Sequence, residues 1–280
     1  MLFNIAIKNL FGAKLRTSLN VFVTSVSFFL VIFVSGMYDG MREHAKNITI
    51  ETEIAGGTYW HPEYDPMDPR TFEHSHSVMP PKIKRLIDQK YAFGVLVSQA
   101  SIYPNGRIMP AIMKGITPSQ TIVNIPTDVL EQDDDITIPV LIGSEMAKNS
   151  NLKIGDSFTI RWLDADRTYD ADEGTIVHIM ETENFKLDQG HIWIPLSKAQ
   201  SMLAMENQAT YVTYAKGLDV IQDTGDWIHH DVDYMIRDME ALIKADEPGA
   251  QVMYSILLAL AAMGISVSYT HLTLPTNSNV

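Results

Sequence analysis

The sequence predicts an α+β domain flanked by transmembrane α-helices, and three observations predict it. No charged residue occurs from Thr17 to Tyr38, a run long enough to cross a bilayer. All 34 acidic residues and 18 of the 21 basic residues lie in residues 39–247, which therefore carry a net charge of -16. Within that stretch, segments of strand alternation and segments of helical spacing follow one another, as is typical of α+β domains.

The uncharged run predicts a first transmembrane helix at residues 17–38. Its polar members are small hydroxyl residues, which can bond back to helix carbonyls and so tolerate lipid. A buried core helix and a cleaved signal peptide are the alternatives. The first is disfavoured because apolar residues surround the helix on all sides. The second is disfavoured because the run is longer than a signal-peptide core and lacks a small-x-small cleavage site.

Flanking charge predicts the orientation of this helix. Lys8, Lys14 and Arg16 precede it without any acidic residue, whereas Asp39 follows it closely. Basic residues stay in the cytoplasm, so we expect a cytoplasmic N-terminus and an outer domain at residues 39–247. Apolar residues recur at helical spacing in residues 1–16, which predicts an amphipathic helix lying on the cytoplasmic membrane surface.

A second apolar run, residues 250–266, predicts the start of a second transmembrane helix near the lower length limit for a span. Residues 267–280 follow without helical periodicity or a charged anchor. The segment VSYTHLTLPT resembles a translated sequencing-adapter sequence. We therefore interpret residues 267–280 as a non-native tail, and expect the second span to be truncated and the native chain to continue.

Gly36 and Gly40 form a GxxxG pair at the outer end of the first span. Such pairs allow two helices to approach closely, so both glycines are candidates for helix packing. The alternative is that Gly40 already lies in the turn that leaves the helix.

The outer domain divides into short strands and helices. Residues 48–54 alternate as a strand does, and two prolines before residue 82 suit a helix start. Ser144 is predicted to cap a short helix that ends at Asn149. The last helix is predicted from about Asp226 to Lys244, with a linker at residues 245–249 before the second span. The remaining predicted strands are residues 93–102, 106–113, 157–163, 175–181, 191–195 and 210–215, with a helix at residues 197–205.

Several function classes are excluded or disfavoured. A domain with a net charge of -16 should repel nucleic acid, so no nucleic-acid partner is predicted. No glycine is followed by lysine, so the chain has no phosphate-binding P-loop, and it has neither GxSxG nor HExxH. The absence of cysteine excludes disulfides and thiolate metal sites. We therefore predict no catalytic residue, no cofactor and no metal site.

Two alternative functions stay open at this stage. His74 and His76, or His229 and its neighbour, could begin a metal site of a membrane-tethered metalloenzyme. Both pairs lack further ligands at recognisable spacing, and solvated surface is the preferred interpretation. The second alternative is a membrane-anchored sensor or ligand-binding module that uses residues 39–247.

Three blocks carry a family resemblance. The first is IAIKNLFGAKLRTSLN with its span, the second is PVLIGSEMAKNSNLKIGDSFTI followed by IWIPLSKAQSML, and the third is DWIHHDVDYMIRDMEALIK leading into the second apolar run. Together they resemble ABC-transporter permeases of the macrolide-exporter and lipoprotein-releasing type (FtsX-like and LolC/LolE-like). In the first block the matching positions are Ala6, Asn9, Leu10, Lys14, Arg16, Thr17 and Leu19.

The resemblance implies a MacB-like periplasmic core and a multi-pass protein of the cell inner membrane. It implies a cytoplasmic ABC ATPase subunit and a second permease subunit, in a homodimer or heterodimer, as partners. It also implies extraction or export of a lipophilic substrate such as lipoproteins, with all ATP hydrolysis in the partner. Family members typically have four spans, so the third and fourth spans are missing here.

The resemblance also indicates a partner-contact segment. Lipoprotein-releasing relatives can carry a long periplasmic hairpin that docks a carrier protein. The matching segment here, Leu163–Gly174, is short and acidic, which weakens the expectation of carrier docking. Its candidate contact residues are Asp164, Asp166, Arg167 and Tyr169.

Overall fold

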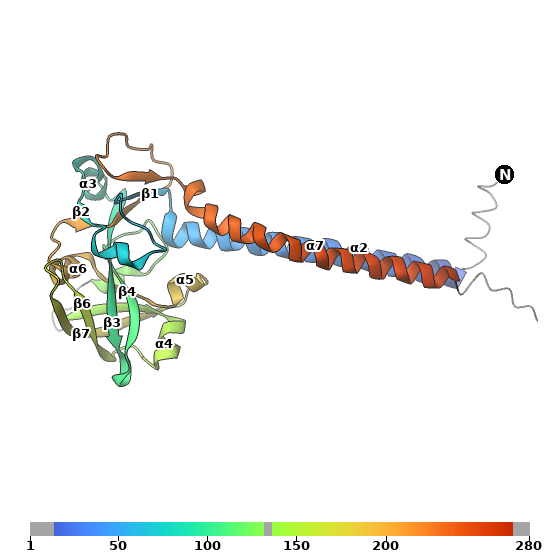
Figure 1. The fold of residues 1–280 in the computed structure, drawn as a ribbon, viewed down its shortest axis with the longest axis horizontal. Helices are drawn as coiled ribbons and strands as arrows, with labels where there is room; N and C mark the ends of the chain where they lie inside the picture. The colour runs from blue at the N-terminus through green and yellow to red at the C-terminus, as the bar shows by residue number, and fades with distance from the viewer. Residues whose placement is uncertain (1–13, 132–135, 271–280) are drawn as a thin grey trace, which may run out of the picture. The chain divides into compact units, whose positions relative to one another are not determined.

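A computed structural model describes residues 14–131 and 136–270. The chain divides into two compact units: unit 1 comprises residues 1–44 and 238–280, and unit 2 comprises residues 45–237. The described part of unit 1 is helical, whereas unit 2 contains the sheets and the short helices (Figure 1). The α+β class predicted for the outer domain is confirmed.

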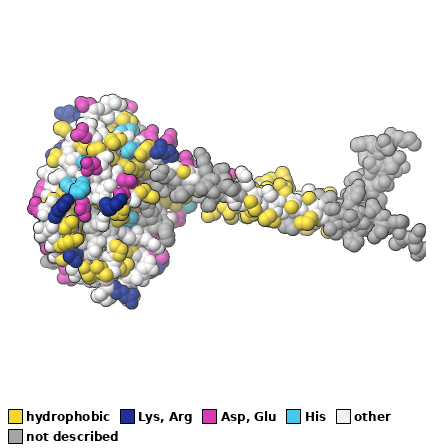
Figure 2. Space-filling view, in the orientation of Figure 1, with side chains coloured by type: hydrophobic (Ala, Val, Ile, Leu, Met, Phe, Trp, Pro, Cys, Tyr) yellow, Lys and Arg dark blue, Asp and Glu magenta, His cyan; other side chains and the backbone are white. Residues whose placement is uncertain are grey.

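Helix α2 extends from Lys14 to Thr49 and contains the whole predicted span. Of the residues that the structure describes, one helix, Val21–Ile54, is long and apolar enough to cross a membrane. Its large side chains face outward; the side chain of Phe22, for example, is 65% exposed. Figure 2 shows hydrophobic side chains covering the visible described surface of the long helices. The surface helix predicted at residues 1–16 lies outside the described residues, except for Lys14 to Arg16 at the start of α2.

The strand predicted at residues 48–54 is wrong, because the chain stays helical there. Helix α2 passes directly into η1, a π-helix at Ile50–Ile54. The Thr52 hydroxyl donates to the Ile48 carbonyl at 2.7 Å, a back-bond within the helix that an extended strand could not form. The alternation of Ile and Thr instead places Thr52 and Ile54 in buried positions of the helix end.

Among the described residues, nine strands form one sheet in the order β11-β1-β10-β3-β4-β8-β5-β7-β6, and β3 also pairs with β6. That second pairing closes the last six strands into a barrel. Strand β3 pairs with a strand outside the barrel and with a strand inside it. Its residues Ala92–Val95 pair with β10, outside the barrel, and its residues Ala100–Tyr103 pair with β6, inside it. The barrel strands are β3 (Ala92–Tyr103), β4 (Met109–Ile116), β5 (Ile138–Gly143), β6 (Ser157–Leu163), β7 (Tyr169–Met180) and β8 (His191–Pro195).

The barrel interior is a core of aliphatic and aromatic side chains. In β6 the predicted alternation is confirmed, because Phe158, Ile160 and Trp162 are buried and the residues between them are exposed. Space inside is limited: a Cβ atom on Gly174 would lie 2.5 Å from the Ile160 Cδ1 atom. A side chain at position 174 would therefore require the side chains of Ile160 and Val140 to move. The other face of β3 and β8 packs against η2 (Pro69–Glu73), η4 (Thr127–Leu130) and α5 (Phe185–Asp188).

Two short helices cover the ends of the barrel strands. Helix α4 spans Ser144–Ser150 and α6 spans Leu196–Leu203. The predicted capping role of Ser144 is wrong. The N-cap position is Gly143, and the Asp188 carboxylate accepts hydrogen bonds from the Glu145 amide at 3.1 Å and the Ser144 hydroxyl at 3.3 Å. The cap therefore comes from a segment distant in sequence.

A smaller region extends the sheet beyond β3. It contains β1 (Gly57–Trp60), β10 (Tyr211–Tyr214) and β11 (Ile228–His230), with helix α3 (Pro81–Asp88) packed against them. A separate pair of strands, β2 (Ser77–Val78) and β9 (Gln208–Ala209), lies beside it. The helix predicted after the two prolines is confirmed as α3, and its residue Ile83 is fully buried.

Helix α7 extends from Val232 to Thr270 and corrects two predictions. It begins later than Asp226 because β11 occupies residues 228–230, and Asp231 then accepts a hydrogen bond from the Tyr234 amide at 2.7 Å. The predicted linker at residues 245–249 is helical. Gly249 does not adopt the positive φ that ends many helices, and α7 continues through the second apolar run. Residues 267–270 belong to α7, and the rest of the predicted tail lies outside the described residues.

Candidate functional site

The predicted contact segment forms a tight hairpin between β6 and β7. The strands pair from Ser157↔Thr175 to Leu163↔Tyr169, so only residues 164–168 form the turn. Asp164 closes this turn: its carboxylate accepts a hydrogen bond from the Thr168 amide at 2.7 Å, and its carbonyl accepts one from the Arg167 amide at 3.0 Å. Arg167 has a φ of 60°, a left-handed conformation that reverses the chain. The segment is therefore a rigid short hairpin, not an extended docking arm.

The four candidate residues do not converge on one point. Asp164 and Arg167 line a groove at the base of the hairpin. Asp166 is exposed at the tip of the turn and does not line that groove. Tyr169 is on β7, where its ring carries the Arg161 guanidinium at 4.2 Å from the ring centre. The hairpin thus offers two separate features, a groove and an exposed cation–π pair.

The hairpin groove, as we call this hollow, has a volume of about 360 Å³. Its size is within the range of small-ligand pockets. Its floor contains the buried side chains of Phe72 and Met205, and its polar rim combines acidic, basic and histidine side chains. The full lining is Phe72, Glu73, His74, His76, Ser98, Gln99, Leu163, Asp164, Ala165, Arg167 and Met205.

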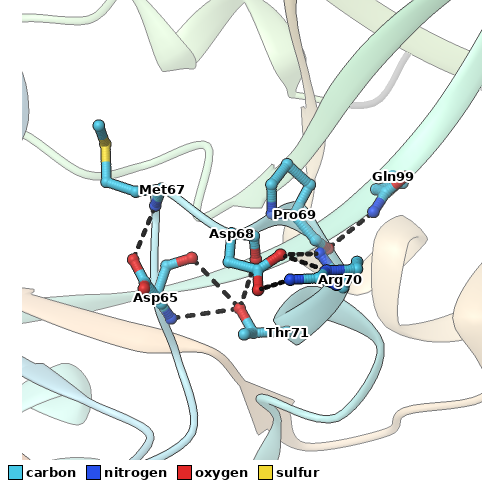
Figure 3. Close-up of polar contacts among 7 residues, drawn as sticks. All are labelled: Asp65, Met67, Asp68, Pro69, Arg70, Thr71 and Gln99. Carbon is cyan, nitrogen blue, oxygen red and sulfur yellow. Dashed lines mark hydrogen bonds and ion pairs between the residues drawn. The ribbon is translucent and has the colours of Figure 1, made fainter.

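Phe72 and Glu73 of η2 line the groove, and polar contacts hold the start of η2 and the loop before it (Figure 3). Asp68 caps η2 by accepting from the Arg70 amide and also forms a two-pronged ion pair with the Arg70 guanidinium at 2.8 and 2.9 Å. These bonds lower the pKa of Asp68 and raise the pKa of Arg70. The Gln99 amide on β3 donates to the Pro69 carbonyl at 2.7 Å. The start of η2 is therefore bonded to β3 of the barrel.

The histidines have structural partners in different places. The Nδ1 atom of His76 lies 2.7 Å from the Gln208 side-chain oxygen, while the Nε2 atom of His229 lies 2.8 Å from the Tyr214 hydroxyl. His74 and His76 line the hairpin groove, whereas His229 belongs to β11 at the other end of the sheet order. Burial lowers the pKa of His229 more than Asp231 raises it. Within residues 14–131 and 136–270, no group of three or more potential ligands is arranged to hold a metal ion.

Gly36 and Gly40 both belong to helix α2, so Gly40 is not in a turn that leaves the helix. Among the described residues, no atom outside the helix backbone comes within 4 Å of a Cβ placed on either glycine. Within the part of the chain that the structure describes, nothing occupies the space beside either glycine, and the packing role of the pair stays a prediction.

Comparison with known proteins finds similar solved structures but no matching sequence. No family model matches the chain, and no curated protein matches its sequence. The similar solved structures include the periplasmic region of MacB from Actinobacillus actinomycetemcomitans, with a TM-score of 0.44 and 12% identity over 69% of this chain and 95% of that chain. They also include the extracellular domain of the noncanonic ABC-type transporter YknZ from Gram-positive bacteria, with a TM-score of 0.35 and 8% identity over 58% of this chain and 83% of that chain.

The sequence analysis missed two features of the structure. The first is the pairing of β1 with β11, in which Thr58 lies opposite His230. The second is the burial of Lys114, whose side chain is only 8% exposed on the central strand β4. The sequence contained a signal for the burial of Lys114, because it is a lone lysine within the apolar run of residues 108–116. A charged side chain in such a run either lies at an exposed edge of the sheet or is buried with a partner.

Proposed function

We propose that this chain is a membrane-spanning permease subunit of an ABC transporter. In this proposal α2 and the apolar part of α7 cross the cell inner membrane, the N-terminus is cytoplasmic, and unit 2 lies in the periplasm. A cytoplasmic ATPase subunit and a second permease subunit complete the transporter, which extracts or exports a lipophilic substrate such as a lipoprotein. The subunit itself has no catalytic role.

One observation carries the proposal: the chain enters and leaves unit 2 at adjacent strands. Strand β1 begins three residues after η1, β11 ends two residues before α7, and the two strands are antiparallel neighbours with Thr58 opposite His230. Paired residues in such strands have Cα atoms about 4.5–5.5 Å apart. Both flanking helices are thus attached to one point of the sheet, which suits a domain inserted between two spans of one membrane.

The attachment has a mechanical consequence for a transporter. A change in the spacing of the two helices acts directly on the β1–β11 pair and, through β10, on β3 of the barrel. Neighbouring strands are joined by ladders of backbone hydrogen bonds and are closely packed, so a displacement of one strand also displaces the strands paired with it. ATP-driven movement of the spans is therefore able to reach the hairpin groove without any covalent chemistry in this subunit.

A sensor or ligand-binding module is the second candidate, and the hairpin groove is the observation that favours it. The groove has pre-formed walls and a polar rim. A module of this kind would need no ATPase partner, so co-purification separates the two functions.

The test uses the chain as encoded by its uninterrupted gene. Residues 1–280 contain no cysteine, so single cysteines at Lys14 and Asp166 report topology once any cysteine encoded elsewhere in the gene has been replaced. We expect a membrane-impermeant maleimide to label D166C but not K14C in intact spheroplasts, and a P-loop ATPase to co-purify with the chain. Labelling of K14C from outside, or recovery of the chain in the soluble fraction, would refute the proposal. Correct topology without an ATPase would favour the sensor.

A further inference from the structure

Strand β7 has an unpaired edge over its first residues. Residues 169–175 of β7 pair with β6 on one side, whereas pairing with β5 on the other side begins only at Gly174. Among the described residues, no strand pairs with residues 169–173 on the β5 side. These residues are exposed, apart from Asp172, which is half-buried. An exposed strand edge is a template to which another strand can add.

The backbone groups that point to this edge belong to alternate residues. Ile176 of β7 donates to the Asp156 carbonyl and accepts from the Gly155 amide, so its backbone groups point to the β6 side. Backbone groups of successive residues in a strand point to opposite sides. The amides of Ala171 and Glu173 therefore point to the open edge.

Two carboxylates already occupy these amides. The Asp170 carboxylate accepts from the Ala171 amide, and the Asp172 carboxylate accepts from the Glu173 amide, both at 2.8 Å. A strand that added to this edge would need the same amides as donors, because strands pair through alternating N–H and C=O groups. The edge is thus bonded to its own side chains.

The same carboxylates oppose pairing between two copies of the chain. An antiparallel pair of β7 edges centred on Ala171 would place Asp170 of one copy opposite Asp172 of the other, twice. Like charges directly opposite each other destabilise a strand pair. Among the described residues, neither carboxylate has an ion-pair partner, since the guanidinium of the neighbouring Arg161 lies over the Tyr169 ring.

We propose that Asp170 and Asp172 hold the β7 edge closed and so prevent two copies of the chain from associating edge to edge. Each carboxylate acts in two ways, by occupying an edge amide and by repelling the second copy. The inference goes beyond the proposed function and does not rest on it, because the edge and its contacts lie within unit 2.

Two double variants separate these two effects. D170N/D172N removes both negative charges but keeps side-chain oxygens that can accept from the next amides. D170A/D172A removes the charges and the acceptors together. Edge-to-edge association should therefore increase from the parent chain to the Asn variant, and again to the Ala variant.

A cysteine at Ala171 reports this association. In an edge pair centred on residue 171, two A171C side chains lie opposite each other with Cα atoms about 5.5 Å apart, which a disulfide can bridge. The full chain, with any cysteine outside residues 1–280 replaced, is oxidised in detergent micelles, and the dimer is measured by non-reducing electrophoresis. Relative to A171C alone, we expect about threefold more dimer with D170N/D172N and about tenfold more with D170A/D172A.

Two controls make the result specific to the edge. In the same pair, residue 166 of one copy is far from residue 166 of the other, so dimer formation through D166C should not rise with D170A/D172A. The variant D219A/D226A removes two exposed carboxylates outside the strand, and it should leave the A171C dimer unchanged. All substituted positions are exposed or half-buried, so melting temperatures should stay within about 3 °C of the A171C chain.

Equal cross-linking of A171C in all three backgrounds would overturn the proposal. An equal rise with D219A/D226A would assign the effect to net charge, and an equal rise through D166C would assign it to unspecific aggregation; both would overturn the proposal as well. If D170A/D172A does not fold, the rise expected for D170N/D172N decides. A failed topology test would remove the transporter and leave this result standing, whereas a failed cross-linking test would remove only the closed edge.

Discussion

The pairing of Thr58 with His230 allows a disulfide to test where the chain enters and leaves unit 2. The two residues are Cα partners in antiparallel strands, and their side chains point to the same face of the sheet. Their expected Cα separation of about 4.5–5.5 Å is within the range that a disulfide bridges. The variant T58C/H230C should therefore oxidise to a single intramolecular disulfide, because the chain contains no other cysteine.

The size of the effect follows from the sequence separation of the pair. The disulfide would enclose about 170 residues, and the chain-entropy relation gives a stabilisation of about 5 kcal/mol for a loop of that length. A unit of this size gains about 2–4 °C in melting temperature for each kcal/mol, so the upper bound is about 10–20 °C. Engineered disulfides often deliver less, and we expect a rise of at least about 5 °C.

The assay compares the oxidised and reduced forms of the same variant by thermal unfolding in detergent. This comparison cancels the loss of the contact between His230 and Tyr234, whose rings stack at 4.0 Å. The control is T58C/I228C. Ile228 pairs with Trp60, so it is diagonal to Thr58 at about 7–8 Å and too distant for a relaxed disulfide. The reasoning would be refuted if T58C/H230C stayed reduced under oxidising conditions, or if both pairs cross-linked equally well.

Three further predictions concern stability. Gly115→Ala should lower the free energy of unfolding by about 1–3 kcal/mol, because the new Cβ collides with the Cβ of Ala199 on α6. Adding A199G should recover part of this loss, as measured by urea titration. Unchanged stability in G115A would contradict the close packing of β4 against α6. Asp188→Ala should lower the free energy of unfolding by about 1–2 kcal/mol in the same titrations, because the cap of α4 is lost. A smaller decrease than in a variant of an exposed Asp would argue against capping. The lowered pKa of His229 contributes stability that is present above about pH 6.5 and is lost as the pH falls. The melting temperature should therefore drop between about pH 7 and about pH 5, and it should drop less in H229Q. An equal drop in both proteins would mean that another group causes the pH dependence.

Much of the local structure could be predicted because it depends on neighbouring residues. The alternation of Phe158, Ile160 and Trp162 predicts both the strand β6 and the face that it buries, since successive side chains of a strand point to opposite sides. The prolines before α3 likewise predict where that helix starts. A hairpin was predicted between the strands at residues 157–163 and 175–181, but β7 already begins at Tyr169, and the tight turn that depends on the Asp164 side chain was not predicted.

The errors occurred where distant residues decide the local conformation. Alternating Ile and Thr in residues 48–54 are compatible with a strand by propensity, and the π-helix prevails because contacts from Asn124 and Asn184 hold it. Ser144 is a good N-cap residue, but Gly143 occupies the N-cap position and Asp188 accepts from the Glu145 amide from another segment. A pattern within a short window contains no information about such partners.

The sequence by itself determined that an uncharged helix precedes a strongly acidic domain and that a second apolar run follows it. These features follow from the composition and charge of each segment, which can be read from the sequence without knowing which distant residues are in contact. Only the tertiary structure decided that β3 closes the barrel by pairing with β6, that Thr58 lies opposite His230, and that the Asn184 side chain donates to Glu53. Each of these contacts joins residues far apart in the chain, and its free energy exists only once the intervening chain has folded and brought the two partners together.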